Sequence, residues 1–261
     1  MRRLAVLAAL LLLALPAVAA PPPVRLAAHR ALYRLTLADG RGQVIGAAGV
    51  MGYQVVDACH SWNVRQRLEL TVTNTDGDTT HMVSEYVTSE AKNGLSFRFH
   101  TTQSTDGAIS SDIAGEARMN RPGGPGVADY ARPEVKQVAL PAGTLFPMGH
   151  TAALIRAAEA GRTFFTLPVF DGTDDAGAEL SSIVALGHRG PTPSHWPALA
   201  ALPSVDVHIA FFGSDTEKML PDYEVGMRYW TNGVADDLRM DFGDFVMVGK
   251  LIGFQLLPSH C

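Results

Sequence analysis

Residues 62–73 read WNVRQRLELTVT, and this stretch decides the fold because its apolar residues recur at every second position. One set of alternating positions is apolar except at Gln66, and it holds Trp62, Val64, Leu68, Leu70 and Val72. The intervening set is polar, and it holds Asn63, Arg65, Arg67, Glu69, Thr71 and Thr73. A period of two over this length is typical of a β-strand with one buried face and one solvated face. The sequence therefore predicts a half-buried strand here.

Strand patterns and tight turns continue on both sides of this stretch. The alternation is weaker in RALYRLTL at 30–37 and recurs in GLSFRFHT at 94–101. Turn-forming pairs lie between strand-like runs, at Asp39-Gly40, Asp76-Gly77, Asn93-Gly94, Asp106-Gly107 and Asn232-Gly233. Such pairs tolerate the positive φ angles of tight hairpin turns. The amino-terminal half is therefore predicted to be an antiparallel meander of about six strands.

One helix is predicted in PMGHTAALIRAAEAG at 147–161, beginning near His150 or Thr151 and stopping at Gly161. Its narrow apolar stripe holds Leu154, Ile155 and Ala158. Strand patterns resume after it, and one of them is expected to run through VADDLRMDFGDF at 234–245. With near a dozen strands and one helix, we expect a mainly β fold. The strands form a single large curved antiparallel sheet, barrel-like, with the helix packed across it.

The amino terminus has the three parts of a secretory signal peptide. Arg2 and Arg3 precede an apolar run, Leu4 to Leu15, and a small-residue cleavage signal at 17–19. We therefore expect a signal peptide at 1–19, a proline-rich leader at 20–28 and a single domain at 29–261. The apolar run, about 12 residues, is shorter than the ~20 that a spanning helix needs, and no later run approaches that length, so the mature chain is expected to be exported and not to span a membrane.

The mature chain is mildly acidic. Removal of the signal peptide takes away two arginines and moves the formal charge from −5 to −7. Nucleic acids and anionic membrane surfaces call for a basic patch on the partner protein. The charge therefore argues against both as main partners.

The two cysteines, Cys59 and Cys261, are 202 residues apart in the sequence. Disulfides persist in oxidising compartments, so one intramolecular bridge is the expectation for an exported chain. Loop-closure entropy for about 200 residues would stabilise the fold by about 5 kcal/mol at most. Such a bridge would tie the end of the last strand to the end of the second and hold the outermost turn of the curved sheet. The alternative is a reactive or metal-binding thiol at Cys59, beside His60.

The usual hydrolase and metal motifs are missing from the sequence. No two histidines have the H-E-x-x-H spacing, and the nearest approach to a nucleophile elbow is Ser214 in FFGSDTE, which reads as a surface turn. The acidic segment Asp171–Asp175 fails the EF-hand pattern. It is predicted to be a solvated turn, the alternatives being a weak cation site or a contact point for a basic partner. We predict no metal site and no cofactor.

A second acidic group lies in VADDLRMDFGDF, at Asp236, Asp237, Asp241 and Asp244. Paired carboxylates serve as acid and base in glycosidases, where they face one another across the substrate. Here Asp237, Arg239 and Asp241 alternate with apolar residues, so a solvated strand face with interleaved charge is the plainer interpretation. No catalytic residue is assigned.

Several segments together resemble a known family. They are AAHRALYRLTL at 27–37, Cys59, LFPMGHTAALIRAAEAG at 145–161, PVFDGTDD at 168–175, MDFGDFVMVGKLIGFQLL at 240–257, and Cys261. The chain resembles the EipB-like periplasmic cell-envelope integrity proteins of alphaproteobacteria. The resemblance implies a β-spiral, closed by a disulfide whose positions Cys59 and Cys261 match. It also implies a periplasmic role in maintaining the envelope under stress, without an enzymatic activity.

Three functions are consistent with these observations. The first is a non-enzymatic periplasmic protein that supports envelope integrity by binding another envelope component, with a protein partner favoured. The second is a carrier of an apolar ligand such as a lipid or a lipoprotein acyl chain, and the third is a cell-wall hydrolase without a recognisable motif. For the carrier, seven aromatic residues either line a cavity or simply fill the core: Tyr33, Trp62, Phe97, Phe99, Phe211, Phe212 and Trp230.

Overall fold

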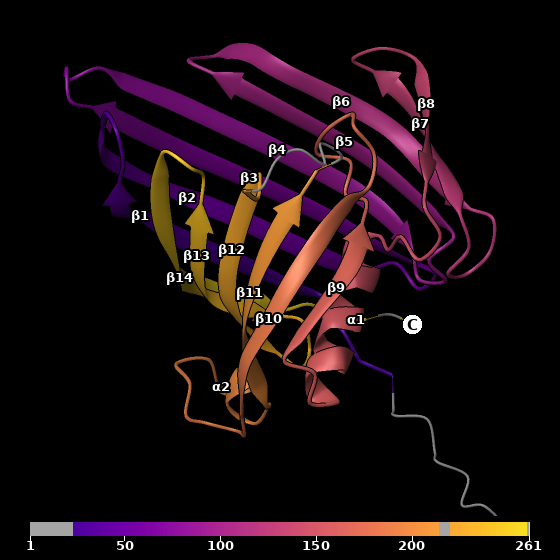
Figure 1. Ribbon diagram of the computed structural model, residues 1–261. Helices are drawn as coiled ribbons and strands as arrows, with labels where there is room; N and C mark the ends of the chain where they lie inside the picture. The colour runs from indigo at the N-terminus through magenta and orange to yellow at the C-terminus, as the bar shows by residue number, and fades with distance from the viewer. Residues whose placement is uncertain (1–22, 214–219, 260) are drawn as a thin grey trace, which may run out of the picture.

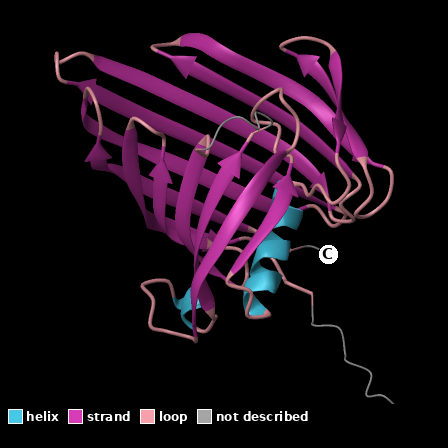
Figure 2. Ribbon diagram, in the orientation of Figure 1, coloured by secondary structure: helices cyan, strands magenta, loops and turns pink. Residues whose placement is uncertain are grey.

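The structure, a computed structural model, describes residues 23–213, 220–259 and 261. Its strands form one continuous antiparallel sheet that curves around a common interior but does not close (Figures 1 and 2). The strands are β1 His29–Gly40, β2 Val44–Asp57, β3 Ser61–Asn74, β4 Thr79–Ala91, β5 Ser96–Thr105, β6 Ala108–Met119, β7 Gly126–Arg132, β8 Lys136–Leu140, β9 Phe164–Val169, β10 Glu179–Arg189, β11 Ser204–Phe212, β12 Tyr223–Trp230, β13 Ala235–Asp241 and β14 Phe245–Leu256. The helices are α1 Pro147–Glu159 and α2 Pro197–Ala200. The predicted mainly β fold is confirmed, whereas the predicted signal peptide lies outside the described residues.

The order of the strands places the first and last strands in the middle of the sheet. That order is β8-β7-β6-β5-β4-β3-β2-β1-β14-β13-β12-β11-β10-β9. Two meanders therefore join where β1 pairs with β14, and the free edges belong to β8 and β9. Leu145 covers part of the β9 edge, because its N–H donates to the Pro168 carbonyl and its carbonyl accepts from the Phe170 N–H, both at 2.9 Å.

The alternation in 62–73 corresponds to β3 as predicted. Val64, Leu70 and Val72 are buried, while Arg65 and Arg67 are exposed. This strand pairs with β2 and β4 over nearly its whole length. A one-residue change of register would move the apolar side chains to the solvent, so the pattern fixes the pairing.

Four of the five predicted turn pairs contain a glycine of positive φ that links two strands: Gly77, Gly94, Gly107 and Gly233. The prediction for Asp39-Gly40 is wrong, because Gly40 still belongs to β1 and the turn follows it, with Gly42 at φ +58°. A Cβ on Gly40 would lie 2.2 Å from the Val44 carbonyl oxygen, so a close approach of the backbone explains this glycine.

Two further differences concern the carboxyl-terminal half. The expected strand at 234–245 is divided into β13 and the start of β14 by a turn in which Gly243 has φ +86°. The irregular stretch around 187–203 contains the four-residue helix α2. Short apolar stretches on both sides of such a turn have the same period as one longer strand, so the pattern alone does not mark the break.

Helix α1 begins earlier than predicted, at Pro147 instead of His150 or Thr151. A proline suits the first helical position because the missing N–H would have no partner within the helix. At the other end, Gly161 has φ +80°, and the Arg162 N–H donates to the Ala157 carbonyl at 3.0 Å. This bond and the one from the Gly161 N–H to the Ala158 carbonyl at 2.8 Å satisfy two of the last carbonyls of the helix, as the stop signal at Gly161 predicted.

Cys59 and Cys261 form a disulfide with their Cα atoms 5.3 Å apart. Cys59 follows β2 and Cys261 follows β14, and these two strands flank β1 on either side. The expectation that the bridge holds the outermost turn of the sheet is therefore wrong. The bridge spans the centre of the sheet, because the first and last strands pair there and the free edges lie elsewhere.

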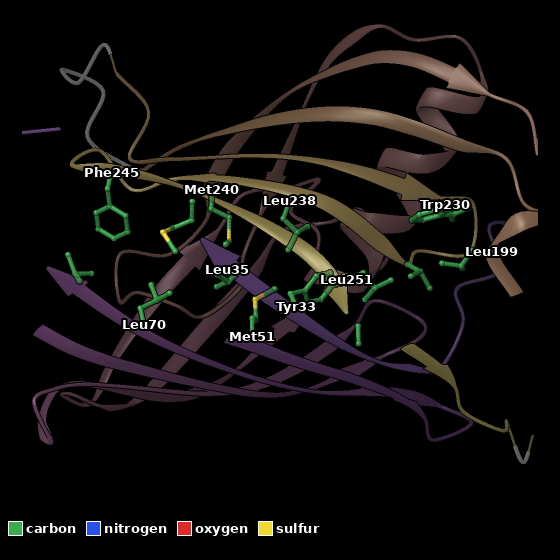
Figure 3. Packing of buried hydrophobic residues seen from close by; sticks show 14 residues of the cluster. Tyr33, Leu35, Met51, Leu70, Leu199, Trp230, Leu238, Met240, Phe245 and Leu251 are labelled. Carbon is green, nitrogen blue, oxygen red and sulfur yellow. The ribbon is translucent and has the colours of Figure 1, made fainter. Parts of the chain in front are cut away.

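The interior contains separate groups of buried side chains. One, which we call the aromatic core, lies between β5, β6, β7 and the segment before α1, and includes Phe97, Phe99, Tyr130, Phe146 and Phe170. Another lies between β1–β3 and β12–β14, and Figure 3 shows its side chains reaching inward from strands on both sides. A third packs Leu154, Ile155 and Ala158 of α1 against β9–β11, which confirms the predicted stripe.

Candidate functional site

A cavity of about 290 Å³ lies in the interior between β1–β3, β12, β13 and α1. Its walls include four methionines, namely Met51, Met148, Met227 and Met240. They also include four tyrosines, namely Tyr33, Tyr53, Tyr223 and Tyr229. Met51 and Met240 come from opposite sides of the curved sheet (Figure 3). The curvature of the sheet thus places a partly enclosed space between two strands that are far apart in the sequence.

The tyrosine hydroxyls at this cavity differ in their hydrogen bonds. The Tyr33 hydroxyl donates to the Ala235 carbonyl at 2.8 Å, whereas the Tyr53 hydroxyl has, among the described residues, only the thioether Sδ of Met148 at 3.9 Å. Burial raises the pKa of both phenols above the ordinary value, so both remain protonated donors. Because a thioether is a weak acceptor, Tyr53 keeps most of its capacity to donate to a stronger acceptor.

Gln66, which interrupts the apolar set of β3, lines this cavity beside its cross-strand partner Tyr53. Its side-chain amide makes no hydrogen bond to any other described residue. His29 also lines the cavity, and its Nδ1–H donates to the Ala27 carbonyl at 2.7 Å, which leaves Nε2 as an acceptor. Burial lowers the pKa of His29, so the ring is neutral at neutral pH. The cavity thus presents neutral donors and acceptors.

The cavity is bounded at one end by α1, which Glu90 of β4 holds in place. The Glu90 carboxylate accepts from the backbone N–H groups of Met148 at 2.7 Å and Gly149 at 2.8 Å, two of the unpaired donors at the helix start. The side chain is 3% exposed, and burial raises the pKa of Glu90 to about 7 although the two donors oppose the shift. The alternation pattern of β4 gave no sign of this role, because the helix that Glu90 caps is far away in the sequence.

His150 and Ser181 lie at the distance expected of a catalytic pair, yet their hydrogen bonds exclude that role. His150 Nε2 is 2.7 Å from Ser181 Oγ, and the same hydroxyl donates to the Leu167 carbonyl at 2.7 Å. Since a serine has one hydroxyl hydrogen, His150 must donate and the serine cannot pass its proton to the imidazole. Burial also lowers the pKa of His150 to about 4. The pair ties α1 to the strands β9 and β10.

The acidic segment 171–175 is more enclosed than the predicted solvated turn. Asp171 accepts from the N–H and hydroxyl of Thr173, and its backbone carbonyl accepts from the Tyr86 hydroxyl at 2.9 Å. Asp175 pairs with Lys136 at 2.6 Å. Burial and the neighbouring carboxylates raise the pKa of Glu179, which follows the segment, to about 8. These groups brace the turn and do not line the cavity.

The outer face of the sheet carries an open groove of about 530 Å³. Arg30, Gln54 and Arg65 form a row across β1, β2 and β3, and Arg30 Nε donates to Gln54 Oε1 at 2.9 Å. Neither arginine has an acidic partner among the described residues. Leu32 is 43% exposed in the groove beside Gly52, where a Cβ would meet nothing within 4 Å. We call this surface the arginine groove.

The residues singled out in the sequence fall into distinct places. Of the seven aromatic candidates, only Tyr33 lines the cavity, and it is also part of a buried core cluster, as are Phe97, Phe99 and Trp230. Trp62, Phe211 and Phe212 are partly buried, and Ser214 lies outside the described residues. Leu238 and Met240 are buried while Arg239 is exposed, so the alternation expected around the aspartates of β13 is confirmed. No cluster suited to holding a metal ion exists within the part of the chain that the structure describes.

None of the helices within the described residues has the length and apolar character required to cross a membrane. This finding concerns helices alone.

Comparisons with known proteins give the context for these sites. Residues 20–258 match the EipB-like family. A curated relative, the cell envelope integrity protein EipB of Brucella abortus (strain 2308), is 32% identical over 253 residues, which cover 93% of this chain and 89% of that protein. A crystal structure from Brucella abortus, described as a beta-barrel-like protein of a domain of unknown function, aligns with a TM-score of 0.82 and 27% identity. It covers 90% of this chain and 100% of that chain. The match over most of its length shows that this chain belongs to the EipB-like family.

Proposed function

We propose that this chain supports the integrity of the cell envelope from the periplasm by binding an envelope protein, without catalysing a reaction. Membership of the EipB-like family and the name of the Brucella relative support the envelope role. The signal peptide expected at 1–19 supports the periplasmic location. The observation that carries the binding role is the arginine groove, where two exposed arginines have no acidic partner within the described chain.

The chemistry of the groove favours an acidic protein segment. Neighbouring strands lie about 4.8 Å apart, and one strand separates Arg30 from Arg65. The backbones from which the two guanidinium groups extend are therefore about 10 Å apart. A guanidinium group forms two parallel hydrogen bonds with a carboxylate, which makes arginine suited to this contact. Leu32 provides an exposed aliphatic side chain beside this row, two residues along β1 from Arg30. A segment with carboxylates and an apolar side chain fits both features.

The test is site-specific photocrosslinking in the exported protein. A photoreactive amino acid in place of Leu32 is expected to give one reproducible protein adduct. The double variant Arg30→Glu with Arg65→Glu should abolish this adduct, since carboxylates would then face carboxylates. The control is the double variant Arg121→Glu with Arg156→Glu, which makes the same change of charge at exposed positions outside the groove. This control should still form the adduct.

A second photoreactive position provides the background. Val135 is 89% exposed and lies outside the groove, so adducts formed there report random collisions. The same protein adduct at both positions would contradict the proposal, as would a lipid adduct at Leu32 in place of a protein. Cleavage of cell-wall material by the purified protein would contradict its non-enzymatic part.

A further inference from the structure

We propose that the interior cavity binds a neutral amphiphile, an apolar chain that carries one uncharged hydrogen-bonding group, and that Gln66 recognises this group. The site lies on the opposite face of the sheet from the arginine groove. The inference therefore stands independently of the protein partner proposed above.

The volume of the cavity sets the size of the ligand. A water molecule occupies about 30 Å³ of liquid, so 290 Å³ corresponds to roughly ten water-sized groups. A single medium-length chain fills this space, whereas a larger lipid would leave most of its atoms outside.

The walls are suited to an apolar chain of variable shape. Four of the nine methionines in the sequence line this one cavity. Methionine side chains are unbranched and polarisable, and they adapt to ligands of different outline. Leu238 and Val225 complete the apolar lining. The walls would therefore make favourable contacts with alkyl chains of different shapes.

Two polar groups of the cavity, the Gln66 amide and the Tyr53 hydroxyl, come from neighbouring positions. These residues pair across β2 and β3, the Gln66 amide has no partner among the described residues, and the Tyr53 hydroxyl has only a thioether. An amide offers both donors and acceptors, so it can bind a hydroxyl, a carbonyl or an amide of the ligand. An apolar residue at position 66 would continue the pattern of β3. Gln66 therefore marks the place where a polar group of the ligand forms its hydrogen bonds.

The cavity excludes charged ligands. No Asp, Glu, Lys or Arg is among the described residues that line it, and His29 is neutral there because burial lowers its pKa. A carboxylate or ammonium group inside would have no counter-ion and would lose its hydration, which is costly. A neutral polar group instead replaces its hydrogen bonds to water with hydrogen bonds to the Gln66 amide.

The experiment uses the mature protein with ¹³C-labelled methionine methyl groups and three probes: octan-1-ol, octanoate and octyltrimethylammonium. Octan-1-ol is expected to shift the methyl signals of Met51, Met148, Met227 and Met240. The signal of Met119, which lies in the aromatic core, should stay unchanged. The two charged probes should bind at least ten-fold more weakly at pH 8.

Gln66→Leu should weaken octan-1-ol binding about two- to ten-fold, the effect of one lost hydrogen bond. Gln103→Leu is the matched control, because Gln103 is exposed on β5 and does not line the cavity, and it should bind like the unsubstituted protein. If Gln66→Leu fails to fold, as the Met119 signal would reveal, Gln66→Met replaces it with the same expected loss. Equal binding by the Gln66 variants, equal binding of octanoate, or unshifted cavity methionines would overturn the proposal.

Discussion

The aromatic core and the cavity lie inside the same curved sheet, yet one is filled and the other is hollow. In the aromatic core, the ring centroids of Phe97 and Phe146 are 5.0 Å apart and those of Phe99 and Phe170 are 5.3 Å apart. A Cβ on Gly172 would lie 2.4 Å from Phe99, so even one added methyl group has no room there. Close packing of this kind stabilises the aromatic core. The cavity lacks such packing and therefore has room for a ligand.

The hollow half uses a different set of residues. Its walls are rich in methionine and tyrosine, and one glutamine replaces an apolar residue. Methionine packs with less definition than the aromatic rings do. We therefore expect substitutions in the aromatic core to change the free energy of unfolding strongly, and a substitution at Gln66 to change ligand binding instead.

The largest effect is expected from Phe97→Ala, because Phe97 is fully buried among four other rings. The change removes a large apolar side chain and leaves a space that the packed neighbours cannot fill. The free energy of unfolding should fall by about 3–5 kcal/mol in urea titrations. Arg98→Ala, at the exposed neighbouring position, should change it by less than about 0.5 kcal/mol. A small effect of Phe97→Ala would remove the distinction between the two halves.

Cys59→Ser should come next, with a loss of about 2–4 kcal/mol, since the bridge restrains the unfolded chain over 202 residues. The loss should also appear in the unsubstituted protein under reducing conditions. Intact mass after alkylation checks the bridge itself. Two alkylated thiols in protein purified from an oxidising compartment would show that no bridge forms there.

The pH dependence of stability should report on Glu90, which holds α1 against the cavity. Its pKa is about 7 in the fold and near 4.5 in the unfolded chain, so folding favours the protonated form. The stabilisation from this group is complete below pH 4.5 and is lost as the pH rises through about 7, by on the order of 3 kcal/mol. Unfolding measured at pH 5 and pH 8 should show this loss.

Glu90→Gln should flatten the pH dependence, because an amide does not titrate in this range. Glu179, with a raised pKa of about 8, changes stability in the same direction, but it is present in both proteins and cancels in the comparison. The same slope in the variant and in the unsubstituted protein would mean that Glu90 keeps its ordinary pKa.

The smallest effect on stability is expected from Gln66→Leu in the absence of ligand. The amide has no partner among the described residues, so its removal leaves no broken hydrogen bond in the protein. The free energy of unfolding should stay within about 0.5 kcal/mol or rise slightly. A large loss in thermal or urea unfolding would show that Gln66 has a structural role, in contrast with a residue kept for a ligand.

Much of the fold could be predicted because its determinants are local. The alternation in 62–73 fixes a strand and its buried face, and the glycines at 77, 94, 107 and 233 fix turns through their positive φ. The helix was predicted with the wrong start, because its first N–H groups bond to Glu90, 58 residues earlier in the chain. The turn after Gly40 was misplaced because a second glycine, Gly42, follows within two residues.

The candidate site could be predicted only in part. Tyr33 was among the aromatic residues considered for a cavity, but Phe97, Phe99 and Trp230 belong to packed clusters. Aromatic residues on an inward strand face have the same pattern whether they line a space or fill it. Gln66 interrupts the apolar alternation of β3 in the sequence. Its role, however, depends on the residues that face it across the cavity.

The sequence by itself determined the class of fold, the inward faces of the strands and the pairing partner expected for Cys59, because these follow from period, turn chemistry and cysteine number. Only the tertiary structure decided that β1 and β14 meet at the centre of the sheet, which places the bridge there and the free edges at β8 and β9. It also decided which inward faces pack and which enclose a cavity. The physical reason is that a cavity depends on the distance between strands far apart in the chain, and no local pattern encodes that distance.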